Sequence, residues 1–413
     1  MQDIIDVFEA LNRSHIKYVV LRGYDPIDEL FSSKDIDVYV SKHDMQSLRD
    51  IFEKLGFRTP RINACAYPHV QFFKLRSSGM IKFDIVTELC YGAQLLTIAN
   101  GEEVLKKAIR YEFINVLPPE MALILLLIHI LLDKGCLSEE NRLRVICVYK
   151  KVTDKKLIPW NEKVKEFCYQ CLNGKIEDTN EYIKINQAAI ISEVDFLDRR
   201  KNVSRLNKIT NRNVKWRYRF HRVHRRTIAL LGVDGSGKST TIKALEKTLG
   251  DGCYVQYMGF REMETKWGKE WYASGKRYKL KFIPFLGVYM EMWYRYLKYR
   301  FKNGRIILFD RFPWEAFDNG TGKYKVMYFI LFKVFFPRPK KVYYLHCPDD
   351  TSLKRKDDIT NEQQFKNMKK RFDSTYMNMK NIISFDTDVL DTSQIVEQIC
   401  DDIMASGFYE YMF

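Results

Sequence analysis

Residues 227–250 read TIALLGVDGSGKSTTIKALEKTLG, a short apolar run followed by a glycine-rich loop and a helix-forming segment that ends at Gly250. Apolar runs of five or six residues are typical of strands in a buried parallel sheet. Two more such runs, IILFD at 306–310 and KVYYLHC at 341–347, alternate with helical stretches. The pattern predicts an α/β domain of the strand–helix–strand type, with a parallel sheet, over residues 227–413.

The glycine-rich loop has the spacing of a phosphate cradle. Residues 232–239 fit G-x-x-x-x-G-K-[ST] at every required position, and they lie between a strand and a helix as this motif requires. Backbone N–H groups and the helix N-terminus would face a phosphate. Lys238 would reach the β- and γ-phosphates of ATP, and the Ser239 hydroxyl would bind magnesium. The predicted nucleotide-binding residues are Gly232, Asp234, Gly235, Ser236, Gly237, Lys238, Ser239 and Thr240.

Three stretches of this region resemble thymidylate kinase and its relatives. They are VDGSGKSTT at 233–241, FKNGRIILFDRFPWE at 301–315 and VYYLHCPDDTSLKRK at 342–356. The resemblance covers residues 227–413 and implies a P-loop kinase that transfers a phosphoryl group from ATP with magnesium. No Asn-Lys-x-Asp element of the GTPase type is seen there.

The resemblance also implies roles for single residues. Carried over by position, Asp310 would lie near magnesium and the acceptor phosphate, and Arg311 would contact the acceptor. Arg355 belongs to a basic cluster that resembles the lid over the γ-phosphate. Asp234 resembles the acceptor-side carboxylate that meets a sugar hydroxyl. With Lys238, residues Asp310, Arg311 and Arg355 form the predicted catalytic set.

The sequence departs from the family where the acceptor is recognised. GFREM at 259–263 stands in place of Thr-Arg-Glu-Pro, so Arg261 is the candidate phosphate-binding arginine of the substrate site. The Ala-Tyr-Gln that reads thymine is replaced by PWEAFDNG at 313–320. Because a base is selected by hydrogen bonds to its edge, thymidylate itself is not predicted as the acceptor. Residues 280–302 either shape a different acceptor pocket or form a packed amphipathic helix.

The N-terminal region has a second set of carboxylates. Asp35 and Asp37 are two apart on an expected strand and so share a face, and Asp84 lies on another expected strand. Three carboxylates on adjacent strands suit two magnesium ions. VVLRGY at 19–24, KDIDVYV at 34–40 and KFDIV at 82–86 resemble a nucleotidyltransferase of the DNA polymerase beta type over residues 1–115. Gly23 and Tyr24 replace that family's Gly-Ser, and a solvent-facing row of aspartates is the alternative interpretation.

Between these regions the pattern predicts helices over 116–205 and a basic linker over 206–226. The stretch 201–226 has ten Lys or Arg and no acidic residue, in a chain of 413 residues with a net charge of +16. It suits an anionic membrane surface, a nucleic acid or a solvated linker. The nine cysteines have no spaced framework and the start MQDIIDVFEA does not resemble a signal peptide, so a cytoplasmic protein, peripheral to a membrane if the linker binds lipid, is predicted.

The fold class predicted is therefore an α/β multidomain chain: a nucleotidyltransferase-like α+β domain, helices, and a P-loop kinase domain. The leading hypothesis is a phosphotransferase for a small phosphorylated or hydroxyl-bearing acceptor, with a second step catalysed by the N-terminal module. The alternative is an ATP-dependent switch or defence protein that acts on nucleic acid and has a non-catalytic N-terminal domain.

Overall fold

The computed structural model describes residues 1–23, 27–32, 35–59, 68–92, 96–97, 99–153, 162–193, 198–199, 226–259, 263–277, 282–299, 306–314, 330–355, 362–377, 379 and 381–408. No helix within these ranges is long and apolar enough to cross a membrane. The chain divides into two compact units, residues 1–74 with 81–214 and residues 75–80 with 215–413.

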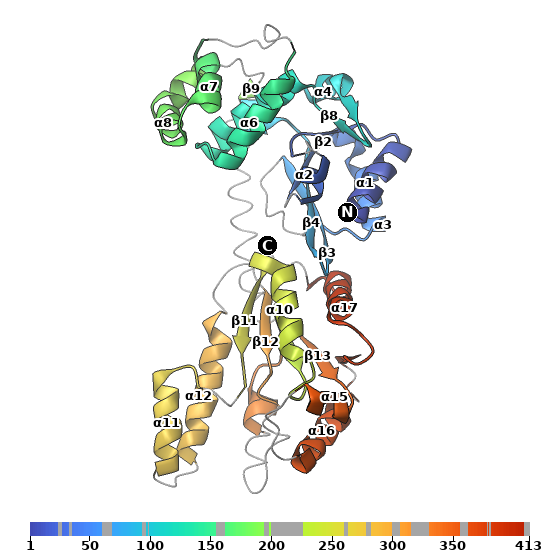
Figure 1. Ribbon diagram of the computed structural model, residues 1–413, viewed down its shortest axis with the longest axis vertical. Coiled ribbons are helices and arrows are strands. Elements are labelled where there is room, and N and C mark those ends of the chain that lie inside the picture. Colours follow the sequence, from blue (N-terminus) through green and yellow to red (C-terminus); the bar gives the residue numbers. More distant parts are fainter. Residues whose placement is uncertain are drawn as a thin grey trace. The chain divides into compact units, whose positions relative to one another are not determined.

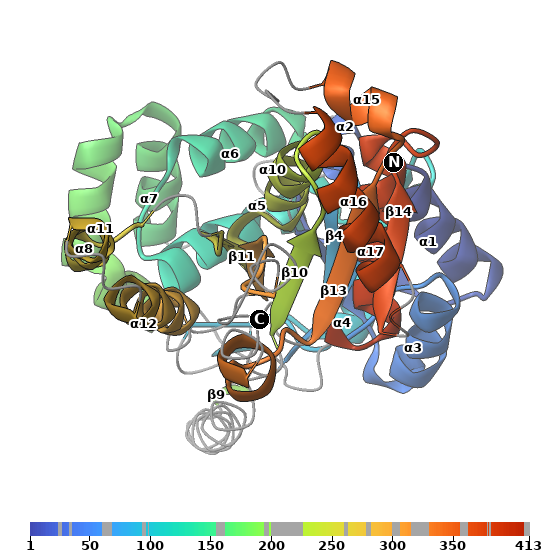
Figure 2. The ribbon, with the colours of Figure 1, turned by 90° about the horizontal axis from the view of Figure 1, so that it is seen from below.

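The C-terminal unit is built on a five-stranded sheet of order β11-β12-β10-β13-β14. All neighbouring strands are parallel, which confirms the predicted parallel sheet. β11, β12 and β13 are labelled in Figure 1, and Figure 2 shows β10 beside β13. The strands are β10 (Thr227–Leu231), β11 (Cys253–Tyr257), β12 (Ile306–Asp310), β13 (Lys341–His346) and β14 (Ile382–Asp386).

The central strands of this sheet are buried along almost their whole length because helices cover both of its faces. Ala229 and Leu231 of β10 pack in one apolar cluster with Met292 and Tyr296 of α12 and Phe372 of α16. α10 contacts α17, and α11 lies alongside α12 (Figure 1). The helical elements are α10 (Lys238–Leu249), η4 (Gly250–Gly252), α11 (Lys266–Arg277), α12 (Phe282–Lys298), the π-helical η5 (Ile330–Phe335), α15 (Asp349–Lys354), α16 (Glu362–Tyr376) and α17 (Thr392–Ala405).

The N-terminal unit contains most of a mixed six-stranded sheet of order β3-β4-β2-β1-β8-β7. β2 is antiparallel to β1 and parallel to β4, and β1 is parallel to β8. Phe8 and Phe52 lie in its apolar core with residues of β1 and β2. The strands are β1 (Tyr18–Val20), β2 (Ile36–Val40), β3 (His69–Arg76), β4 (Gly79–Val86), β7 (Ile109–Tyr111) and β8 (Ile114–Val116), with α1 (Gln2–Arg13), α2 (Ile27–Ser32), η1 (Lys42–Asp44), α3 (Met45–Lys54) and α4 (Gly101–Lys107).

The helices of the middle region belong to this same compact unit rather than to a unit of their own. Their shared core includes Leu127, Val145, Phe167 and Ile183. The elements are α5 (Pro119–His129), the π-helical η2 (Ile130–Lys134), α6 (Glu139–Lys151), α7 (Glu162–Asn173) and α8 (Ile176–Glu193). A small sheet of order β5-β6-β9 joins β5 (Cys90–Tyr91), β6 (Leu96–Thr97) and β9 (Asp198–Arg199). The basic linker, apart from Arg226, lies outside the described residues.

Candidate active site

The phosphate-binding loop follows β10 directly and ends where α10 begins. Gly235 has a φ of +82°, and a Cβ there would lie 2.6 Å from the Ser352 carbonyl oxygen of α15. Gly237 has a φ of +84° and precedes the first residue of α10. Residues other than glycine rarely adopt such backbone angles, and at Gly235 there is also no room for a side chain. The glycines therefore permit the tight loop that the motif predicts.

Two side chains of the loop are buried beneath it. Lys238 is 6% exposed, and its Nζ donates to the carbonyl oxygen of Val233 at 2.6 Å. The Ser236 hydroxyl is also buried and has no hydrogen-bond partner among the residues that the structure describes. A buried polar group without a partner is unusual in proteins, and it fits a loop that completes its hydrogen bonds with a bound phosphate. Ser239 and Thr240 are exposed at the start of α10.

The predicted acceptor-side residues lie beside this loop. Arg311 forms an ion pair with Asp234, through Nη2 and Oδ1. Arg311 has a φ of +68°, and its backbone N–H donates to the carbonyl oxygen of Leu230 at 3.1 Å. A positive φ at a residue other than glycine costs free energy, and such strain is common at functional sites. The strained backbone at Arg311 is therefore consistent with a functional position.

Asp310 is the last residue of β12. Burial raises the pKa of its carboxyl group, while the nearby charges of Lys238 and Arg311 lower it and that of Asp234 raises it. The net pKa is above the ordinary aspartate value, because burial disfavours the charged form. The structure thus brings together Lys238, Asp234, Asp310 and Arg311, as the sequence predicts.

Arg355 comes to the same edge of the sheet from the end of α15. Its guanidinium group donates to Thr387, which follows β14. The Thr387 side chain would lie 3.7 Å from a Cβ at Gly237, so it borders the phosphate-binding loop. Lys356 of the predicted basic cluster and the candidate substrate residue Arg261 lie outside the described residues.

The donors around the loop fit a nucleotide-bound magnesium ion. Ser239 offers an exposed hydroxyl and Asp310 a carboxylate, and magnesium commonly takes one or two protein ligands plus phosphate oxygens and water. Within the described ranges, no group of three or more His, Cys, Asp or Glu side chains is placed to hold a metal ion.

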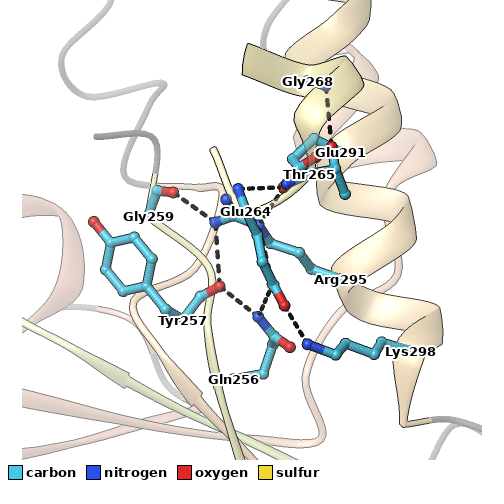
Figure 3. Close-up of polar contacts among 9 residues, drawn as sticks. All are labelled: Gln256, Tyr257, Gly259, Glu264, Thr265, Gly268, Glu291, Arg295 and Lys298. Atoms are coloured by element: carbon cyan, nitrogen blue, oxygen red, sulfur yellow. Dashed lines mark hydrogen bonds and ion pairs between the residues drawn. The ribbon is translucent and has the colours of Figure 1, made fainter. Parts of the chain in front are cut away.

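A buried polar cluster beside β11 was not singled out from the sequence. Glu291 and Arg295 of α12 form an ion pair and bond to the chain on either side of residues 260–262 (Figure 3). The segment 280–302 was predicted either to shape a pocket or to form a packed helix. The signal available was an acidic and a basic residue four apart in a mostly apolar helix, the spacing at which side chains meet.

The N-terminal carboxylates are each engaged by a cation. Arg22 donates from Nε to Asp37 Oδ2 at 2.6 Å, and Lys82 lies 2.9 Å from Asp35. Asp37 and Asp84 are register partners on β2 and β4, so two of the three carboxylates are adjacent. Binding of magnesium by these carboxylates would therefore require the cations of the chain to give up these contacts.

His69 contacts the third carboxylate, that of Asp84. Its Nδ1 lies 3.1 Å from both oxygens of Asp84. Burial lowers the pKa of His69, but its hydrogen bond and charge interaction with Asp84 raise it, and the net pKa is above the ordinary histidine value. Arg22, Asp37 and His69 line a small cavity of about 50 Å³ together with His129 and Asp133 of the middle helices. His129 and Asp133 were not predicted as site residues.

Comparisons with known proteins support the kinase prediction for the C-terminal region only. Residues 231–403 match the family model of thymidylate kinase. Among solved structures, similar chains include deoxyadenosine kinase from M. mycoides (19% identity, 44% of this chain and 99% of that chain, TM-score 0.31). Another is thymidylate kinase from Candida albicans (21% identity, 45% of this chain and 94% of that chain, TM-score 0.35). No curated protein matches the sequence. The match over residues 231–403 therefore supports a thymidylate kinase-like P-loop kinase domain in this part of the chain.

Proposed function

We propose that this protein is an ATP- and magnesium-dependent phosphotransferase that acts on a small phosphorylated or hydroxyl-bearing acceptor, with nucleotides as the first class to test. One observation carries the proposal. At the carboxyl edge of a parallel sheet, a P-loop with buried Lys238 lies next to Asp310 and the Asp234–Arg311 pair. Ligands of open parallel sheets bind at this edge.

The residues of the candidate active site fall into two groups, one that binds ATP, the phosphoryl donor, and one that binds the phosphoryl acceptor. The loop N–H groups and Lys238 hold the phosphates of ATP, and Ser239 and Asp310 hold the magnesium ion, which neutralises phosphate charge. Arg311 and Asp234 face the acceptor side, where an arginine suits a phosphate and an aspartate a hydroxyl group. Arg355 adds positive charge at the nucleotide. Catalysis by such a set is positioning together with stabilisation of the charge that develops on the transferred group.

The experiment is transfer of label from γ-³²P-ATP to nucleoside monophosphates, nucleosides, sugars and polyol phosphates. Labelled product is expected from one class, and Lys238→Ala abolishes it. Lys243→Ala is the matched control, because Lys243 is exposed on the same helix and outside the loop. Absence of labelled product from every class would contradict the proposal. ATP hydrolysis that requires nucleic acid and falls steeply with salt would instead support the alternative, a nucleic-acid-associated switch.

Nucleotidyl transfer by the N-terminal unit is a second, separate proposal. The adjacency of Asp37 and Asp84 on parallel strands favours it, and their engagement by Arg22 and His69 opposes it. Incubation with α-³²P-nucleotides tests it on the full chain. Transfer that survives Lys238→Ala and is lost in Asp37→Asn would support a second active site; no transfer would leave the unit as a binding module. We also propose that the protein is cytoplasmic and that its basic linker, residues 206–226, contacts an anionic membrane surface.

A further inference from the structure

Two fully buried charges lie on α12, away from the phosphate-binding loop. The side chains of Glu291 and Arg295 are 0% and 1% exposed, and Arg295 Nε lies 3.0 Å from Glu291 Oε1. Taking a carboxylate and a guanidinium group out of water is costly, and the mutual attraction offsets this only when the remaining donors and acceptors are also satisfied. Buried pairs of this kind contribute little net stability, so their other contacts indicate what they do.

Arg295 holds the end of β11. Its Nη1 donates to the carbonyl oxygen of Gly259 at 3.1 Å and to that of Tyr257 at 3.3 Å (Figure 3). Tyr257 is the last residue of the strand. One residue further, the backbone N–H of Met258 donates to the carbonyl oxygen of Asp310 at 2.8 Å. The same turn of chain is therefore tied both to Arg295 and to a residue of the candidate active site.

Glu291 holds the start of α11. Its Oε1 accepts from the backbone N–H of Glu264 at 2.8 Å and of Thr265 at 3.2 Å, and its Oε2 accepts from the Thr265 hydroxyl. Thr265 in turn accepts from the N–H of Gly268 at 3.0 Å, which caps the first turn of the helix. A Cβ at Gly268 would lie 2.6 Å from Glu291 Oε2, so the absence of a side chain permits this close approach.

We propose that Glu291 and Arg295 act as a clasp, a pair of positioning residues that sets the geometry of acceptor binding. The clasp holds Gly259 and Glu264, and the neighbouring Met258 N–H is bonded to the carbonyl oxygen of Asp310 in the candidate active site. Arg295 donates two hydrogen bonds to backbone carbonyl oxygens, and Glu291 accepts two from backbone N–H groups, so the clasp fixes the main chain at 257–259 and 264–265 rather than one side chain. Misplacement of a binding group by about 1 Å costs about 100-fold in rate. The inference rests on the proposed phosphotransferase function.

The test uses the full chain with Glu291→Gln and Arg295→Met together. This double variant leaves no unpaired buried charge. The introduced glutamine keeps an oxygen for the two N–H groups, while the bonds to Tyr257 and Gly259 are removed. The expected result is an acceptor KM raised about tenfold or more, or a kcat/KM lowered about 100-fold. The KM for ATP stays within twofold. Arg295→Lys retains charge but lacks the planar fork, and it is expected to rescue part of the loss.

Lys298→Met is the matched control. Lys298 pairs with the Glu264 carboxylate, which also lies 3.8 Å from Arg295 Nε, and its replacement leaves the four backbone bonds of the clasp in place. It is expected to change acceptor KM less than twofold. A folded double variant with unchanged acceptor kinetics would overturn the inference, as would an equal effect of Lys298→Met.

Amide hydrogen exchange separates this inference from the proposed function. The N–H groups of Glu264 and Thr265 are expected to exchange faster in Glu291→Leu with Arg295→Met than in the wild type, whether or not an acceptor is known. Failure of the wild type to phosphorylate any of the four deoxynucleoside monophosphates would count against nucleotide kinase activity but not against the clasp. Unchanged exchange at those two amides would overturn the clasp alone.

Discussion

Arg355 donates two hydrogen bonds to Thr387, from Nη1 to the side-chain oxygen and from Nη2 to the carbonyl oxygen, each 3.0 Å long. Thr387 follows β14 and borders Gly237 of the phosphate-binding loop. An arginine of the predicted lid is thus held beside the phosphate-binding loop by the residue that follows the last strand of the sheet. Because guanidinium donors are fixed in a planar fork, a two-bond contact sets the direction of the whole group.

Replacement of Arg355 by alanine is expected to lower kcat by about 100-fold, since removal of one preorganised donor to developing charge has an effect of this size. The acceptor KM is expected to change little, because the proposed role of Arg355 is at the transferred phosphate. Steady-state kinetics with varied ATP and acceptor measure this. Lys354→Ala is the control, and an equal loss in both variants would show that general positive charge, not the held arginine, matters.

Asp234→Asn is expected to raise the acceptor KM about tenfold with the KM for ATP within twofold. The substitution removes the charge that pairs with Arg311, and a charge-assisted hydrogen bond is stronger than a neutral one. The kinetics are compared with Asp251→Asn, an exposed aspartate beyond the end of α10. A change in ATP binding alone would place Asp234 with the donor instead.

Gly235→Ala is expected to destabilise the loop and to weaken binding of a fluorescent ATP analogue at least tenfold. The new Cβ would approach the Ser352 carbonyl oxygen to 2.6 Å, and the φ of +82° adds about 1–3 kcal/mol of strain. Gly250→Ala is the matched control, because its φ is +51° but no atom lies within 4 Å of its Cβ position. Equal binding by the two variants would show that crowding against α15 is unimportant.

The pKa values of the two histidines in the N-terminal cavity are expected to be shifted in opposite directions, that of His69 upward and that of His129 downward. Burial lowers the pKa of both, but at His69 the contacts with Asp84 outweigh burial and raise the net pKa, whereas at His129 burial prevails over the hydrogen bond to Asp133. NMR titration of the histidine ring protons measures both values. Asp84→Asn should lower the pKa of His69 and leave that of His129 nearly unchanged; a pKa of His69 below 6.5 in the wild type would contradict this.

The sign of the stability effect follows from the raised pKa of His69. Its stabilising contribution is fully present below the unfolded pKa and is lost as pH rises through the higher folded pKa. The free energy of local opening of β3 and β4, measured by hydrogen exchange, should therefore fall as pH rises above about 6.5 in the wild type. His69→Gln should show a smaller fall over the same range.

Alkylation should distinguish the cysteines by burial. Burial raises the pKa of the Cys168 and Cys400 thiols to about 12, so they carry almost no thiolate at neutral pH. Cys136 and Cys147 are exposed. Mass spectrometry after brief treatment with iodoacetamide is expected to find label on the exposed pair first. Early label on Cys168 would show that α7 opens readily.

The C-terminal fold follows from short-range patterns. An apolar run, a G-x-x-x-x-G-K-S loop and a helix in direct succession predict the β10–loop–α10 unit, and the resemblance to thymidylate kinases is confirmed by the family match over 231–403. These signals suffice because strand burial, glycine conformation and helix initiation each depend on residues close together in the sequence. The nucleotidyltransferase resemblance and the single-residue roles stay predictions.

Long-range packing decided the rest. Neither the sequence period nor any motif shows that Glu291 and Arg295 are buried together against the backbone of residues 257–265, because the contact depends on how α12 lies across the end of β11. Likewise, three aspartates on strands suggest a metal site, whereas the tertiary structure places Arg22, His69 and Lys82 against them. A carboxylate has the same chemistry in either setting. Whether it faces a metal or an internal cation depends on neighbours that are distant in sequence, and only the folded chain brings them together.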